Sequence, residues 1–191
     1  MRIVIPILGF VLLLPAAGAA QELQAGASYT LLSLSYPDQI PNGFGGWVSW
    51  DLVDASADPS LTVGLDATLN IFPEDHPIIG RQVQLVGGVR GGLRTDRLRA
   101  LGRIRPGVVT FGERFIAPDT VCIAIFPTPE ECLVDKRNFA VDAGVTLEWL
   151  TSERLVLRFD FGDTLIRFNR EARDASWTNN LQFAAGAGWR F

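Results

Sequence analysis

After residue 20 the chain contains no apolar run long enough for a membrane-spanning helix, which needs roughly 20 consecutive apolar residues. It has only one histidine and two cysteines, so it offers few groups for general-base catalysis or for holding zinc. Its net charge of −4 argues against a nucleic-acid partner, because phosphate binding requires a concentrated basic face. Yet 48% of its residues are hydrophobic, and the order of those residues predicts the fold.

The N-terminal segment has the three-part order of a secretory signal peptide. Arg2 precedes the apolar run Ile3–Leu14, and small residues follow in Pro15–Ala20. The alternative is a transmembrane anchor, but the run is shorter than a spanning helix requires. We therefore predict that residues 1–20 are a signal peptide and that residues 21–191 form a single domain.

The last eleven residues alternate between apolar side chains and polar or small ones, as a half-buried β-strand requires. Seven further runs alternate in the same way. This pattern predicts an all-β fold, an eight-stranded antiparallel up-and-down transmembrane β-barrel that turns its apolar face to lipid. The expected strands are residues 22–35, 42–53, 60–72, 81–94, 98–111, 137–149, 154–167 and 181–191.

Two places in this pattern are irregular. Pro106 donates no ladder hydrogen bond and Gly107 follows it, so we expect the alternation to slip there. Beyond Asp163 the phase of the seventh strand is ambiguous, because apolar residues occupy both faces.

The connections between strands alternate in length. Outer-membrane barrels have short periplasmic turns and longer outer loops, so this alternation predicts that both termini lie in the periplasm. The short connections are 54–59, 95–97 and 150–153, and the mostly longer ones are 36–41, 73–80, 112–136 and 168–178.

Aromatic residues fall near both ends of the expected strands, as in the interfacial girdles of membrane barrels. Trp149, Trp189 and Phe191 are expected at the periplasmic ends, and Phe44 and Phe139 near the outer ends. Ordinary core aromatics of a soluble barrel are the alternative interpretation.

Charged residues recur at positions that face the interior of the expected barrel. An eight-stranded barrel is just wide enough for its own side chains, so these charges have to pair. We favour a salt-bridged filling over a proton or ion path. The predicted lumen ion-pair network comprises Asp51, Asp66, Arg90, Arg94, Arg99, Arg103, Arg105, Asp142, Glu148, Arg158, Asp160 and Arg190.

The longest connection, 112–136, contains both cysteines. Cys122 and Cys132 have no nearby histidine, so a disulfide is favoured over a metal site. The apolar stretch Val121–Pro127 is either a contact surface for an extracellular partner or a hairpin extending the neighbouring strands.

No catalytic constellation is found. His76 lies in an expected loop without a positioned partner. The glycine pairs at 45–46, 87–88 and 91–92 lie inside strands, where they indicate curvature or close packing instead of phosphate loops. The sequence therefore predicts a protein that is not an enzyme and has no metal or cofactor.

Three segments carry a family resemblance: Gly43–Val48, Gly102–Val109 and Arg158–Asp163 look like pieces of small OmpA-like outer-membrane β-barrel proteins. The chain differs from OmpA itself in ending with the barrel, without a peptidoglycan-binding domain. The resemblance implies a monomeric barrel among outer-membrane lipids, with structural, adhesive or host-interaction roles. It also implies that the terminal strand is a signal for the barrel-assembly machinery, carried by Phe183, Trp189 and Phe191.

Three functions follow as hypotheses. The first is a non-enzymatic outer-membrane barrel with a filled lumen, whose loops have a structural or surface-interaction role. The second is a narrow, porin-like channel for ions or small solutes. The third is a soluble, secreted, lipocalin-like barrel that binds a lipophilic ligand, which would place Leu61, Val63 and Leu65 inside.

Overall fold

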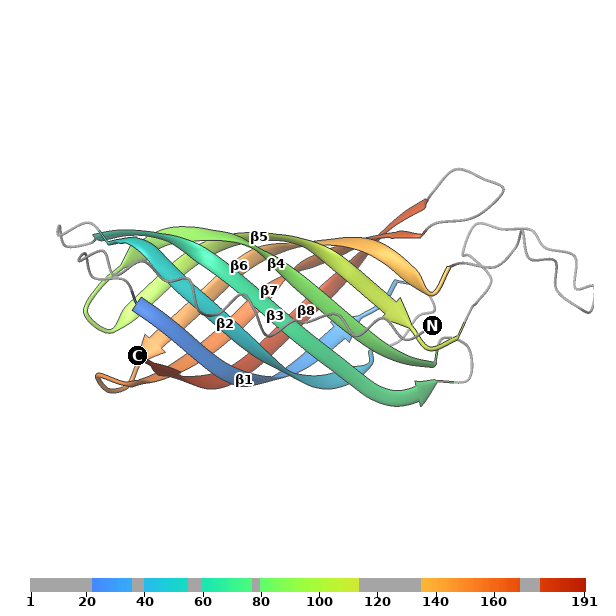
Figure 1. Cartoon of the computed structure of the whole chain (residues 1–191), viewed down its shortest axis with the longest axis horizontal. Helices are drawn as coiled ribbons and strands as arrows, with labels where there is room; N and C mark the ends of the chain where they lie inside the picture. The colour runs from blue at the N-terminus through green and yellow to red at the C-terminus, as the bar shows by residue number, and fades with distance from the viewer. Residues whose placement is uncertain (1–21, 36–39, 55–59, 77–79, 114–134, 169–175) are drawn as a thin grey trace, which may run out of the picture.

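The computed structural model describes residues 22–35, 40–54, 60–76, 80–113, 135–168 and 176–191. They form eight antiparallel strands that pair in chain order and close into a barrel (Figure 1). The predicted eight-stranded up-and-down barrel is thereby confirmed. The strands are β1 (Glu22–Ser33), β2 (Asn42–Asp54), β3 (Ser60–His76), β4 (Gly80–Arg94), β5 (Leu98–Phe111), β6 (Arg137–Leu150), β7 (Leu155–Phe168) and β8 (Ser176–Arg190).

The barrel closes where β1 pairs with β8, from Gln24 opposite Arg190 to Ser33 opposite Leu181. The backbone N–H of Phe191 donates to the carbonyl oxygen of Leu23 at 2.9 Å. The start of β1 and the end of β8 therefore share one end of the barrel, as expected (Figure 1). We call it the short-turn end, because it also carries the connections 55–59, 95–97 and 151–154.

The opposite end carries the connections 34–41, 77–79, 112–136 and 169–175, and we call it the long-loop end. The largest departure from the expected bounds is the connection between β3 and β4. The connection predicted at 73–80 spans only 77–79, because β3 continues to His76, with a register shift between Phe72 and His76. The last strand likewise begins at Ser176 and not at Leu181.

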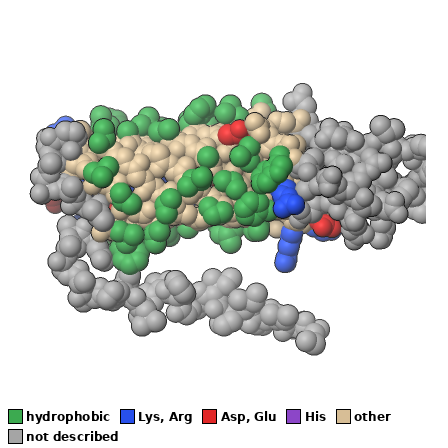
Figure 2. All heavy atoms as spheres, turned by 90° about the horizontal axis from the view of Figure 1, so that it is seen from above, with side chains coloured by type: hydrophobic (Ala, Val, Ile, Leu, Met, Phe, Trp, Pro, Cys, Tyr) green, Lys and Arg blue, Asp and Glu red, His purple; other side chains and the backbone are tan. Residues whose placement is uncertain are grey.

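The two faces of the wall differ in chemistry. In β3, Leu61, Val63 and Leu65 are 52%, 40% and 42% exposed, whereas the alternating residues Thr62 and Asp66 are buried. Apolar side chains cover much of the outer surface between the two ends (Figure 2). The lipocalin-like hypothesis placed those three residues inside, so its central expectation is wrong.

The slip expected at Pro106–Gly107 is also wrong. Arg105 and Val109 are both buried, and the register between β5 and β6 runs without a shift past Pro106. The missing N–H interrupts only the pairing with β4, between Val86–Gly107 and Val89–Ile104, and the register is the same on both sides. In β7 the alternation likewise continues beyond Asp163, with Ile166 buried.

No helix in the described part of the chain is long and apolar enough to cross a membrane.

Candidate functional site

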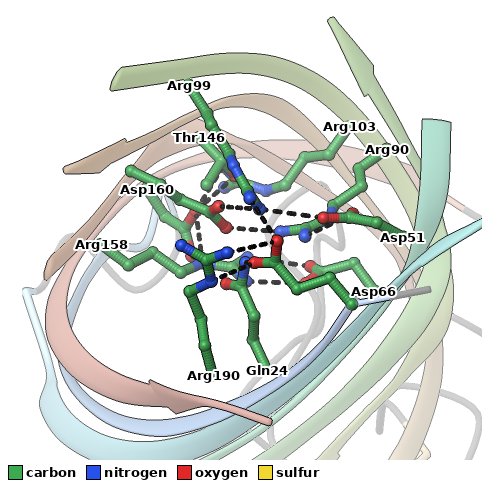
Figure 3. Close-up of polar contacts among 12 residues, drawn as sticks. Gln24, Asp51, Asp66, Arg90, Arg99, Arg103, Thr146, Arg158, Asp160 and Arg190 are labelled. Atoms are coloured by element: carbon green, nitrogen blue, oxygen red, sulfur yellow. Dashed lines mark hydrogen bonds and ion pairs between the residues drawn. The ribbon is translucent and has the colours of Figure 1, made fainter. Parts of the chain in front are cut away.

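The interior of the barrel toward the short-turn end is filled by charged side chains (Figure 3). The structure places all twelve residues of the predicted network there, in ion pairs with one another or with Glu22. The charged residues are Arg90, Arg94, Arg99, Arg103, Arg105, Arg158 and Arg190 with Glu22, Asp51, Asp66, Asp142, Glu148 and Asp160.

Glu22 organises the mouth at the short-turn end. Its carboxylate accepts hydrogen bonds from Arg99 Nη2 at 2.7 Å and Arg190 Nη2 at 2.9 Å, and Arg94 Nη1 lies 3.5 Å away. The sequence reasoning missed Glu22, although it lies two residues before Gln24 and therefore in the interior-facing phase. It joins strands β1, β4, β5 and β8 at the edge of the barrel.

A group of four charges lies deeper in the barrel. Asp51 accepts Arg90 Nη2 at 2.6 Å and Arg99 Nη1 at 2.9 Å. Glu148 accepts Arg90 Nη1 at 2.5 Å, with Arg99 Nη1 at 3.5 Å. Two arginines therefore share two carboxylates, so each buried charge has two opposite neighbours.

Six further charges form a closed ring of alternating sign, which we call the charged ring. On one side, Asp66 lies 2.6 Å from Arg105 and 2.7 Å from Arg158, and Arg158 lies 3.0 Å from Asp160. The other side is completed by Arg103, 3.1 Å from Asp160 and 2.9 Å from Asp142, with Asp142 3.0 Å from Arg105. The side chains come from β3, β5, β6 and β7.

The charged ring compensates every charge that it buries. Removing one partner from such an arrangement leaves an unpaired charge in the interior, at a cost of roughly 3–5 kcal/mol. Arg158 has a further contact, because its guanidinium lies 4.7 Å from the ring centroid of the buried Trp47. Two glycines make room for that indole: a Cβ on Gly26 would lie 2.7 Å from it, and one on Gly188 would lie 2.5 Å from it.

An uncharged polar layer continues the filling toward the long-loop end. Asn70 Nδ2 donates to Gln84 Oε1 at 2.8 Å, and Gln84 Nε2 donates to Gln182 Oε1 at 3.1 Å. Thr164 also donates to Gln182 Oε1, at 2.7 Å. These amide and hydroxyl groups are buried and bonded across the lumen from β3, β4, β7 and β8.

Apolar side chains fill the interior at the long-loop end, and we call this cluster the apolar plug. The sequence reasoning did not predict it. The sequence feature that could have predicted it is the position of Phe72, Phe111 and Phe168, which lie in the interior-facing phase near strand ends. The rings of Phe111 and Phe168 lie 6.0 Å apart between centroids. The apolar plug comprises Leu32, Leu34, Phe72, Val109, Phe111, Ala140, Ile166 and Phe168.

The outer face carries aromatic residues near both ends of the strands. Trp149 and Trp189 lie near the short-turn end, 50% and 46% exposed, as expected. Phe139 lies near the other end and meets Trp177 edge to face, with centroids 6.3 Å apart. Trp177 was missed because the last strand was expected to begin at Leu181.

Several predicted features lie outside the described residues: the disulfide between Cys122 and Cys132, the stretch Val121–Pro127 and the signal peptide 1–20. His76 ends β3, but its side chain is also outside the described set. Within the described ranges, no group of histidine, cysteine, aspartate or glutamate side chains could hold a metal ion.

By sequence, no protein family and no curated protein matches the chain. By structure, the chain is similar to Neisserial surface protein A, with a TM-score of 0.52 and 11% identity over 91% of this chain and 98% of that chain. This likeness supports the same barrel fold and thus the resemblance to small outer-membrane barrels at the level of fold.

Two further structures align over most of the chain with lower scores. The N-terminal β-barrel domain of Pseudomonas aeruginosa OprF gives a TM-score of 0.49 at 12% identity, covering 89% of this chain and 97% of that chain. Ail, the attachment invasion locus protein of Yersinia pestis, gives 0.48 at 12% identity, covering 90% and 97%.

The fold and its two faces define a class: an eight-stranded barrel with an apolar outer surface and a filled interior. Within that class, this chain has charged side chains from the short-turn end to the middle of its interior and an apolar plug at the long-loop end.

Proposed function

We propose that the chain is an integral bacterial outer-membrane β-barrel with a closed lumen, which presents its long-loop end at the cell surface. The observation that carries the proposal is the arrangement of the faces. Leucine, valine and aromatic side chains are 39–74% exposed on the outside, while seven arginines are paired inside. In water this arrangement would expose an apolar area without a partner, whereas in a bilayer it is the expected one.

The filled interior favours a structural or surface-interaction role over transport. A continuous path for ions through the lumen would have to cross the charged ring, the uncharged polar layer and the apolar plug. Apolar constrictions of this kind oppose ion passage because they hold no water. In planar bilayers we therefore expect no conductance from the wild-type protein, and conductance that disappears in Arg103→Gln would favour the channel hypothesis instead.

We propose that the protein is not an enzyme and acts as a monomer through its surface loops, with 112–136 as the segment that meets an extracellular partner. Phe183 and Trp189 lie on the outer face of β8, 43% and 46% exposed, and Phe191, 74% exposed, directly follows the strand. That position fits an assembly signal, since an exposed terminal strand is accessible before the barrel closes.

Cell fractionation tests the membrane placement. The protein should sediment with outer membranes and change its gel mobility between unboiled and boiled samples, as closed barrels do when they unfold. Protease added to intact cells should cut within 112–136. Recovery of the folded protein from the soluble periplasmic fraction would contradict the proposal.

A further inference from the structure

Three arginines point away from the barrel at the long-loop end, and we call them the arginine patch. Arg81 is on β4, Arg137 on β6 and Arg167 on β7, and all three side chains are exposed. Figure 2 shows basic side chains on the outer surface where the apolar covering ends. These arginines contrast with those of the lumen, which are buried and paired.

The strand register places the three arginines in one sector of the wall. Arg137 pairs with Thr110 of β5, which pairs with Val83, two residues from Arg81 on β4. Arg167 pairs with Phe139, two residues from Arg137 on β6. Arg137 therefore lies diagonal to Arg167 across adjacent strands and is separated from Arg81 by one strand, distances that long side chains can span.

The positive charge of this sector has no ion-pair partner among the described residues, in contrast to the lumen. The acidic groups that face it are Glu113, exposed just after β5, Asp135, two residues before Arg137 and engaged in an interaction of its own, and Asp163, two outward positions below Arg167 on β7. Asp163 is already engaged, because its Oδ1 accepts the backbone N–H of Asn180 at 2.6 Å. Among the described residues the three guanidinium groups therefore have no ion pair of their own, and an anion from outside the chain would supply one.

Immediately below the arginine patch the outer surface is apolar and aromatic. Val83 and Phe139 occupy the next outward positions after Arg81 and Arg137 and are 39% and 42% exposed, and Trp177, 51% exposed, pairs directly with Arg167. A ligand that matches basic side chains next to an apolar surface has an anionic head and apolar chains. At the same end of the wall, the described residues of β8 and β1 present Asn179, Ser33 and Ser35 instead.

We propose that the arginine patch binds the phosphate groups of a phosphorylated lipid in the leaflet on the long-loop side, with the acyl chains against Phe139 and Trp177. Guanidinium groups bind phosphate oxygens in pairs of parallel hydrogen bonds and lose little hydration in doing so. The proposal rests on the membrane placement above, and it adds a ligand class and a sector of the wall to it.

The test uses the full-length mature protein in detergent micelles, with native mass spectrometry to measure lipid binding. Diphosphoryl lipid A is the probe, and phosphatidylcholine is the lipid without net charge. We expect Arg137→Gln/Arg167→Gln to weaken binding of diphosphoryl lipid A roughly 25-fold, since each basic group near a membrane surface contributes about a fivefold factor. Binding of phosphatidylcholine should not change.

The matched control is Arg97→Gln/Arg154→Gln, which removes two exposed arginines from the short-turn end. It should bind diphosphoryl lipid A like the wild type. Equal weakening in both double variants, or none in either, would overturn the proposal. Displacement of the lipid by an equal concentration of inorganic phosphate would assign the patch to free phosphate instead.

The gel-mobility shift of each variant shows whether the barrel has formed. A variant that keeps the shift and sediments with membranes, yet binds diphosphoryl lipid A like the wild type, contradicts the lipid proposal alone. A wild-type protein that is soluble without detergent contradicts the membrane placement and this inference together.

Discussion

The two halves of the barrel interior are both buried but differ in their dominant chemistry. Toward the short-turn end, buried arginines and carboxylates pair across the strands, and at the long-loop end phenylalanine, leucine and isoleucine pack together. Burying an ion pair stabilises little in net terms, since desolvation offsets attraction, but breaking one is costly. Apolar packing stabilises directly. We infer that the charged half specifies the register between strands, whereas the apolar half supplies stability and closure.

The largest expected effect comes from opening the charged ring at its most connected member. Arg158→Met leaves Asp66 and Asp160 each short of one partner and removes the contact with Trp47. We expect a loss of about 4–5 kcal/mol in the free energy of unfolding. Urea titration in lipid vesicles, followed by the gel-mobility shift, measures it. Arg154→Gln, at an exposed site, is the control and should change stability by less than about 0.5 kcal/mol.

The apolar plug should give a somewhat smaller effect, which arises from a cavity and not from an unpaired charge. Phe111→Ala removes a buried ring that contacts Phe168, and we expect a loss of about 3 kcal/mol. Because no charge is involved, the loss should be the same at low and high salt. A loss that shrinks strongly with salt would show that the two halves do not differ as described.

Removing a charge pair together should be milder than removing one member. In Asp66→Asn/Arg158→Met, the remaining ring members Arg105, Asp142, Arg103 and Asp160 form a neutral chain. We expect the double variant to be about 2 kcal/mol more stable than Arg158→Met alone, measured as a double-mutant cycle. Strictly additive losses would indicate that the ring is not coupled.

The smallest effect is expected at the mouth. Arg190 lies 2.7 Å from Glu22, but its side chain remains 20% exposed. Arg190→Gln should cost less than about 1 kcal/mol, and salt should reduce this loss further, because water screens the pair. A loss as large as that of Arg158→Met would mean that the mouth is as dry as the ring.

Much of the wall could be predicted from the sequence because its faces alternate with a period of two. Leu61, Val63 and Leu65 against Thr62 and Asp66 specify a strand and its faces without reference to any other strand. Assigning charges to the lumen followed from the same phase, and the structure brings all twelve predicted residues together. The pairing partners did not follow, because they depend on register between strands.

The misses have physical causes. Pro106 does not shift the register, because its missing N–H affects only one of its two neighbouring strands. Phe72, Phe111 and Phe168 were not predicted to fill the lumen, because an apolar residue facing inward at a strand end breaks the rule of apolar outside and polar inside. Trp177 was not predicted on the outer face, because the alternation is weak in the first residues of β8 and they were not recognised as strand.

The assignment of the two faces is tested most directly by tryptophan fluorescence in brominated phosphatidylcholine bilayers. Trp47 is 2% exposed in the lumen, whereas Trp149 is 50% exposed on the outer surface. Two single-tryptophan variants, each retaining one of these residues and carrying phenylalanine at the other tryptophan positions, are compared. Strong quenching of Trp149 with little quenching of Trp47 is the predicted result, and quenching of Trp47 as strong as that of Trp149 would contradict the account.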